Sequence, residues 1–433
     1  MGGAAVCETN LNSAGFHGAH TGTIMIKNVT RLMLLSAALL GGTSTAALAL
    51  EADQFADRLV ETARIMGLSF AYDAATADGD TITISDFTIL LPGEDPIEVP
   101  GDLVFEGVVE TADGGYTAAR ATIADVDYTD EDEGFSVSLV DIAVEGIELP
   151  AQVSVANAMQ IGMSLYDRMV AGPLAVTDPD GNEVFTVALM ESAVSESAAD
   201  GGITSSYDVS GIRVDLSSLE EPEARKALEA LGMEVFTGSM GGSGTWWPDT
   251  GVVSLDDMSF VADDLASFSM AFALEGYTEE LYTEMMKINL KMAEMTEAGE
   301  ELSDEQVMAM SQSMLASMED VKLASGSLRY DDASLFMKVL EIIGAEQGVD
   351  ADTFKAGLQF MVPMALAEVE DQAFKTMVTN AVNTFIADPQ NFTISVAPDE
   401  PVAFSTFEER ADEIESDPFV LVDLLNVQIT AND

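Results

Sequence analysis

The mature part of the chain opens with a helical pattern and continues with alternating strands. Apolar residues at Phe55, Leu59, Ala63 and Met66 share one face of a helix over 53–66, which Gly67 is placed to end. Period-2 segments follow and predict an antiparallel meander with hairpin connections at 113–115 and 130–134. The predicted strands are 81–84, 87–91, 103–109, 116–128, 135–144, 184–189 and 203–216, interrupted by a short helix at 156–170.

A second round of the same pattern begins near Glu221. A helix that starts at Pro222 and ends at 231–233 precedes strands at 234–236, 251–261 and 267–274. The helix end at 65–68 resembles the one at 230–233, and the strand at 82–87 resembles the one at 252–258. This parallel suggests an internal duplication of a helix-plus-meander unit, although short strand patterns also recur by chance. We therefore expect two units, at 50–220 and 221–433.

The last third of the chain is predominantly helical. Leu281, Met285, Ile288, Met292 and Met295 recur at spacings of three and four, and the capping box at 303–306 starts a further helix. The apolar face of that helix contains Met310, Met314 and Met318, so the two helices predict a helical hairpin. After a strand at 322–330, the pattern predicts helices at 332–345, 351–361 and 366–386 and strands at 392–396 and 427–430. The fold class is α+β, with antiparallel β meanders and flanking helices.

An export signal is predicted between Met25 and Ala49. Lys27 and Arg31 precede the apolar run Leu32–Leu40, which is shorter than the roughly 20 residues of a membrane span, and a small-x-small cleavage site ends at Ala49. We expect residues 1–24 to be a mis-assigned extension, 25–49 a cleaved signal peptide, and the mature chain to be periplasmic.

The composition restricts the chemistry of the mature chain. Cys7, His17 and His20 are the chain's one cysteine and two histidines, and all precede the expected cleavage site. A Ser-His-Asp triad, a thiolate nucleophile, a disulfide and an imidazole or thiolate zinc site are therefore excluded after Ala49. No cofactor is expected.

Acidic residues dominate throughout the chain. Its 76 acidic and 17 basic residues become 75 and 15 once Glu8, Lys27 and Arg31 are removed, a formal charge of −60. This charge argues against nucleic acid and anionic lipid headgroups as partners. The acids are spread along the chain, which is typical of a solvated acidic surface, whereas cation binding is the alternative.

The methionine pattern is the most unusual candidate site. Clustered thioethers bind Cu(I) in exported proteins, but the heptad spacing is explained by core packing alone. A third interpretation is a methionine-lined surface that receives an apolar ligand or a partner. Its residues would be Leu281, Met285, Ile288, Met292, Met295, Met310, Met314 and Met318.

Three other features have a chemical and a structural interpretation. The carboxylate-rich loops at 130–134 and 178–183 could hold calcium but lack the spacing of the twelve-residue calcium loop, so they are expected to be turns. Trp246 and Trp247 stand beside a turn, where packing is expected and contact with a sugar or a partner is the alternative. Paired carboxylates are the remaining acid–base equipment, as in glycoside hydrolysis, yet pairs arise readily among so many acids. No catalytic or metal-binding residue is assigned.

The strand Gly-Asp-Thr-Ile-Thr-Ile-Ser-Asp at 79–86, after the helix ending at Gly67, resembles exported alphaproteobacterial proteins of unknown function. The repeated strand-Asp-strand texture is similar to that of AsmA-like envelope proteins. This resemblance implies a non-catalytic envelope role and no particular functional residue. We expect an exported protein that binds an apolar ligand or an envelope protein, with a carboxylate-dependent glycan hydrolase and an acidic cation-binding protein as alternatives.

Overall fold

The structure is a computed structural model. It describes residues 51–90, 96–130, 134–217, 225–226, 228–229, 232–297, 308, 312–313, 316–367 and 369–433. The expected leader, the capping box at 303–306, Met310 and Met314 lie outside the described residues, as does most of the helix predicted from Pro222. The predicted helical hairpin is for this reason not described beyond its first helix.

The N-terminal half is built from helix α2 (Ala52–Ile65) and short antiparallel strands. Gly67 follows the helix with φ +82°, a conformation that suits glycine and turns the chain into β1. A small sheet has the order β1 (Ser69–Ala71), β4 (Thr88–Leu90), β5 (Ile97–Glu98). The remaining strands of this half are β2 (Ala74–Asp78), β3 (Thr81–Ser85), β6 (Leu103–Glu106), β7 (Val109–Glu110), β8 (Tyr116–Ile123), β9 (Val126–Thr129), β10 (Ser136–Leu139), β11 (Ile142–Leu149), β12 (Tyr166–Ala171), β13 (Leu174–Thr177), β14 (Glu183–Val187) and β15 (Leu189–Glu196).

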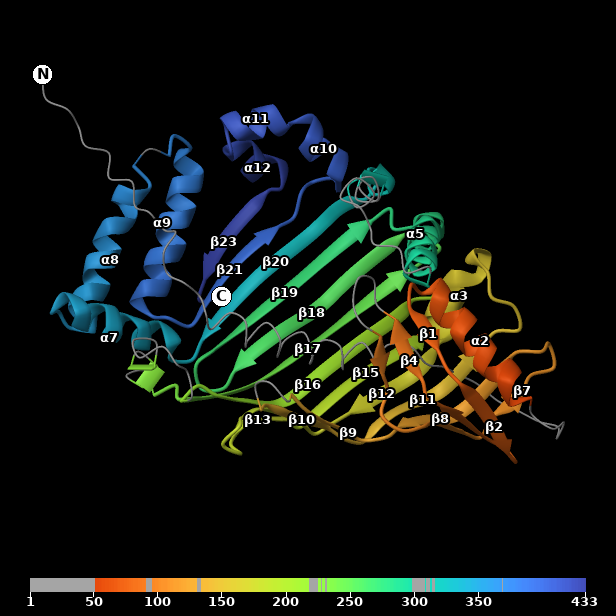
Figure 1. The fold of residues 1–433 in the computed structure, drawn as a ribbon. Helices are drawn as coiled ribbons and strands as arrows, with labels where there is room; N and C mark the ends of the chain where they lie inside the picture. Colours follow the sequence, from red (N-terminus) through yellow and green to blue (C-terminus); the bar gives the residue numbers. More distant parts are fainter. Residues whose placement is uncertain are drawn as a thin grey trace, which may run out of the picture. The chain divides into compact units, whose positions relative to one another are not determined.

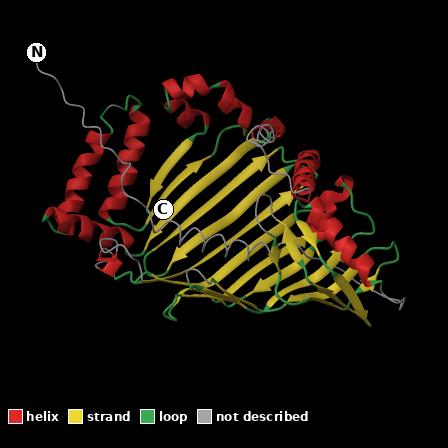
Figure 2. Ribbon diagram, viewed as in Figure 1, coloured by secondary structure: helices red, strands yellow, loops and turns green. Residues whose placement is uncertain are grey.

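The C-terminal half consists of long strands with helices at their ends (Figures 1 and 2). Its strands are β16 (Ile203–Asp215), β17 (Val235–Trp247), β18 (Val252–Ala262), β19 (Ala266–Glu275), β20 (Lys322–Asp332), β21 (Asn391–Val396), β22 (Val402–Ala403) and β23 (Val427–Ala431). Its helices are α5 (Glu279–Glu297), α7 (Leu335–Gln347), α8 (Ala351–Ala365), α9 (Gln372–Ala387), α10 (Phe404–Glu409), α11 (Ala411–Ser416) and α12 (Phe419–Leu424). The α+β class is confirmed.

Antiparallel pairing connects both halves into one large sheet. Its strands follow the order β2-β3-β6-β8-β11-β12-β15-β16-β17-β18-β19-β20-β21-β23. A branch, β9-β10-β13-β14, joins it where β14 pairs with β16. The expected boundary at residues 220/221 falls between β16 and β17, which pair from Ile203↔Trp246 to Asp215↔Val235. The main-chain hydrogen bonding of the sheet therefore continues across that boundary, and the internal duplication stays a prediction.

One face of the sheet can be followed from strand to strand, because directly opposed residues point to the same side. Such a row of cross-strand partners begins in the first half and ends in the last strand. Its members in order are Ile82, Phe105, Ala121, Val144, Met169, Ser192, Tyr207, Gly242, Met258, Met270, Leu328, Ile394 and Ile429. All but Ser192 and Gly242 carry apolar or aromatic side chains, so this side is the apolar face of the sheet.

The first half of this face is a closed core. Ile82 and Phe105 are fully buried, and Val144 is 2% exposed. Helix α2 supplies the cover, since the ring of Phe55 meets that of Phe105 edge-on with centroids 4.9 Å apart. Edge-to-face rings at this distance add to the apolar burial that holds helix and sheet together.

Several predicted elements need correction. The helix expected over 156–170 covers only η2 (Val155–Asn157) and α3 (Ala158–Ser164), after which Tyr166–Ala171 forms strand β12. The strand expected at 234–236 extends to Trp247, because the glycines that break the local pattern are held by strands on both sides. Positive φ angles at Gly107 and Asp141 divide two strands predicted as continuous. The helix expected from residue 366 begins at Gln372, where Asp371 accepts a hydrogen bond from the amide of Phe374 at 2.8 Å.

Candidate functional site

In the C-terminal half, the described helices leave much of the apolar face of the sheet without a cover. We call the apolar side of β18, β19, β20 and β21 the uncovered face, and its most exposed residues come from all four strands. They are Met258 (39% exposed), Phe260 (42%), Phe268 (47%), Leu328 (40%) and Ile394 (39%). Cross-strand pairing places these residues side by side, so they form one patch rather than scattered apolar positions.

The uncovered face continues as rows of apolar partners toward both ends of the strands. Phe260, Phe268, Tyr330 and Phe392 form the row nearest α7. Leu255, Phe272, Gly326 and Val396 form a row on the other side of the Met258 row, followed by Trp246, Val253, Leu274 and Leu323. Within these described strands, the rows contain no charged side chain.

Strand geometry gives the size of this surface. The distance from β18 to β21 is about 14 Å at about 4.8 Å per strand spacing, and that from Phe268 to Leu274 is about 20 Å at about 3.4 Å per residue. Its area of roughly 300 Å² is similar to that of the largest apolar patch on a typical monomeric protein, which is often a functional surface.

The opposite face of the same strands is polar. Ser259, Ser269, Ser327 and Ser395 alternate with residues of the uncovered face. In the first half, that side carries Glu145 between Arg120 and Arg168 at N–O distances of 3.1 and 3.4 Å. Arg168 also makes two hydrogen bonds, of 2.8 and 2.9 Å, to Glu191, and these bonds lower the pKa of the Glu191 carboxyl. In an antiparallel sheet, the polar face usually contacts water and the apolar face packs on a core. The exposure of the apolar face in this half of the sheet is therefore unusual.

Helix α5 contacts one end of the uncovered face. Trp246 stacks on Tyr282 of α5 with ring centroids 5.3 Å apart, and its indole N–H donates to the carbonyl oxygen of Tyr277 at 2.7 Å. Burial raises the pKa of Tyr282 to about 12. Trp246 is therefore a packing residue, and this end of the face is closed by an aromatic cluster.

Helices α7, α8 and α9 form a cavity at the other end. Its volume is about 560 Å³ and its lining is apolar. Tyr330 and Phe392 of the uncovered face belong to that lining, so the cavity is continuous with the face. The other lining residues are Phe336, Leu358, Met361, Val362, Ala365, Val382, Phe385 and Ile386.

Among the described lining residues, only Tyr330 has a polar side chain, and its hydroxyl already has a hydrogen-bond partner. The hydroxyl of Tyr330 donates to Asp332 at 2.6 Å, and the same carboxylate oxygen accepts the amide of Phe336 at 2.8 Å in the first turn of α7. Burial and this carboxylate raise the pKa of Tyr330 well above its usual value. The tyrosine therefore stays neutral and presents its ring to the cavity.

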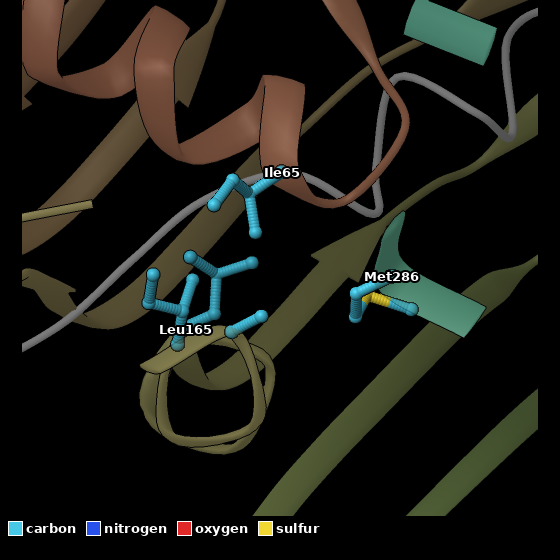
Figure 3. Packing of buried hydrophobic residues seen from close by; sticks show 5 residues of the cluster. Ile65, Leu165 and Met286 are labelled. Carbon is cyan, nitrogen blue, oxygen red and sulfur yellow. The ribbon is translucent and has the colours of Figure 1, made fainter. Parts of the chain in front are cut away.

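The methionine pattern at 281–318 lies only partly within the described residues. Leu281 is buried at 8% exposure, and Met285 packs on a core cluster of Ile65, Ala158, Ile161, Leu165 and Met286 (Figure 3). Ile288, Met295 and Met318 are half-buried. The side chain of Met292 and the whole of Met310 and Met314 lie outside the described residues. The start of α5 thus packs between α2 and α3, as the core-packing interpretation predicts.

The carboxylate-rich loop at 178–183 is a turn closed by its own hydrogen bonds. Asp178 Oδ1 accepts from the amides of Asp180 and Asn182, and Asp178 Oδ2 accepts from the side-chain amide of Asn182. These bonds lower the pKa of Asp178. In the part of the chain that is described, no three acidic side chains gather as a metal site would require, and no helix is both long and apolar enough to cross a membrane.

Sequence reasoning located the strands of the uncovered face without identifying their function. The alternation of Phe268, Met270, Phe272 and Leu274 with small residues shows that β19 has an apolar side. The same alternation occurs at Ile82 and Ile84, which are fully buried. The local pattern does not predict whether a helix covers the apolar side of a strand, because the covering helix comes from a distant part of the sequence.

Comparison with known proteins gives limited information. A family model described as "Uncharacterized protein" matches residues 259–432. This stretch begins within β18 and includes β19–β23 and α7–α9, so it contains most of the uncovered face and every described residue that lines the cavity. No curated protein matches the chain.

Proposed function

We propose that this protein is a non-catalytic, exported protein of the bacterial cell envelope that binds the hydrocarbon part of a lipid on the uncovered face. The observation that carries the proposal is the contrast along one cross-strand row. Phe105 is fully buried under α2, whereas Leu328 on the same side of the same sheet is 40% exposed. The open half of this apolar surface is therefore suited to reversible binding of an apolar ligand, which would cover it.

The dimensions and the chemistry of the face favour an acyl chain. A lipid leaflet contributes about half of a hydrocarbon core of about 30 Å, so a chain reaches about 15 Å. The uncovered face measures about 20 Å by 14 Å, and its longer dimension accommodates such a chain in full. The adjoining cavity of about 560 Å³ is lined by the same kind of side chains. A glycan hydrolase would require a pair of carboxylates in the cavity, and the described lining consists of aliphatic and aromatic residues instead, so the lipid is the better supported ligand.

A dye titration with a matched pair of variants tests the proposal. The full chain is expressed with its own leader in a bacterial host, purified without detergent and titrated with N-phenyl-1-naphthylamine, an uncharged apolar dye. Leu328→Asp places a charge on the uncovered face, and Ser327→Asp places the same charge one residue away on the polar face.

We expect the wild-type protein and Ser327→Asp to bind the dye and Leu328→Asp to bind it at least tenfold more weakly. Circular dichroism of both variants checks that they are folded. Failure of the wild-type protein to bind dye, or equal binding by the two variants, would contradict the proposal.

A further inference from the structure

Helix α8 presents an apolar outer surface that its neighbours leave open. Between Ala356 and Ala367 the only polar side chain is that of Gln359, and none of the residues of α8 is fully buried. Phe360 is 74% exposed, Met364 65% and Met361 60%, and the first two are the largest exposures among the large apolar residues that the structure describes. We call the surface formed by Phe360, Met361 and Met364 the α8 patch.

The α8 patch and the cavity share one helix. Met361 belongs to both, and Leu358 and Val362 on the inner side of α8 line the cavity. The cavity in turn includes Tyr330 and Phe392 of the uncovered face. One continuous apolar surface therefore leads from the outside of α8 to the sheet.

Two lysines mark the ends of the apolar stretch. Lys355 immediately precedes it and donates to the carbonyl oxygen of Ala387 at 2.9 Å. Lys375 of α9 donates to the carbonyl oxygen of Ala367, the last residue of the stretch, at 3.4 Å. Ammonium groups beside an exposed apolar helix match the phosphate level of a lipid layer above its hydrocarbon.

The net charge decides between the occupants of the α8 patch. A second copy of the chain would bring two molecules of formal charge −59 together, and an anionic bilayer would repel the chain in the same way. A bilayer without net charge offers hydrocarbon to the patch and phosphates to the lysines without this repulsion. We infer that the α8 patch docks the protein on a zwitterionic lipid surface, from which an acyl chain reaches the cavity beside the uncovered face; this inference rests on the proposed function.

Vesicle flotation separates the docking from the binding. The purified full chain is mixed with phosphatidylcholine vesicles, and the protein that rises with them is measured. The test variant is the double substitution Phe360→Glu and Met364→Glu, whose side chains are outside the cavity lining. The matched control is Tyr128→Glu with Val235→Glu, at positions 49% and 43% exposed and away from the uncovered face.

We expect the wild-type protein and the control to float with vesicles and the α8 variant to bind at least tenfold less. The α8 variant should still bind the apolar dye, whereas Leu328→Asp should lose the dye and keep flotation. Vesicles containing an anionic lipid should bind the protein less at low salt. Equal flotation of the α8 variant and its control, stronger binding to anionic vesicles, or a dimer that the α8 variant abolishes in place of flotation would overturn the inference.

Discussion

Phe105 and Phe268 lie on the same side of the same sheet, and their truncation should have unequal consequences for stability. Phe105 is fully buried, with the ring of Phe55 packed edge-on against it at a centroid distance of 4.9 Å. Phe268 is 47% exposed on the uncovered face. Substitution of each by alanine removes the same atoms from the two environments.

The expected costs follow from burial. Phe105→Ala leaves a cavity under α2 and should lower the free energy of unfolding by about 3–5 kcal/mol. A fully buried phenylalanine contributes about 1.5–3 kcal/mol by transfer alone, so the half-exposed Phe268 accounts for about 1–1.5 kcal/mol. No closed cavity forms on the uncovered face, and water fills the space. The difference between the variants is therefore about 1.5–4 kcal/mol.

Urea unfolding followed by far-ultraviolet circular dichroism measures both values on purified protein without added lipid. Equal slopes of the transitions would show that the free energies can be compared. Costs that agree within about 0.5 kcal/mol, or a larger cost for Phe268→Ala, would refute the claim that one half of the apolar face is covered and the other open.

Three further predictions concern stability. The folded-state pKa of Tyr282 is raised to about 12 from 10.0, so the neutral tyrosine contributes to folding stability below pH 10, and this contribution is lost as the pH rises toward 12. Tyr282→Phe should therefore flatten the fall of the urea midpoint between pH 9 and 11.5. An unchanged fall would contradict this prediction. The pKa of Glu191 is lowered from 4.5 by Arg168, so the ionised carboxylate contributes to folding stability above pH 4.5, and this contribution is lost as the pH falls through the folded-state pKa. Glu191→Gln should lower the free energy of unfolding by less than about 1 kcal/mol at pH 7 and should not change it in acid. A loss of stability that persists in acid would exclude the ion pair as its source. A Cβ atom at Gly242 would lie 2.8 Å from Cε1 of Tyr207, so Gly242→Ala should lower the free energy of unfolding by about 1–3 kcal/mol. Gly357 of α8 has open space around it, so Gly357→Ala should raise the free energy of unfolding by about 0.5–1 kcal/mol. Urea midpoints that move in the same direction would contradict both predictions.

Local signals in the sequence were sufficient for elements with a strong period. The apolar spacing of α2 and the glycine after it predicted the helix within one residue at each end. The alternating patterns of β19 and β20 predicted two long strands, β19 within one residue at each end and β20 within two residues. In these elements the residues that decide the conformation are neighbours in the chain.

Elements held by distant partners were predicted less well. The glycines at 241, 242 and 244 of β17 favour a loop locally, yet β16 and β18 pair with them on both sides. Phe105 and Phe268 have similar surroundings in the sequence, and only the position of α2 makes one buried and the other exposed. The methionine pattern was compatible with core packing, with Cu(I) binding and with an apolar surface, and its first turns lie in the core, where Ile65 and Ile161 cluster with Met286.

Photo-crosslinking tests the central claim most directly. Benzoylphenylalanine replaces either Phe268 on the uncovered face or Ser269 on the polar face, and the protein is irradiated with a bacterial membrane lipid extract. Intact-mass spectra then report any lipid adduct. The account predicts a lipid adduct at position 268 and none at position 269; no adduct at 268, or equal adducts at both positions, would contradict it.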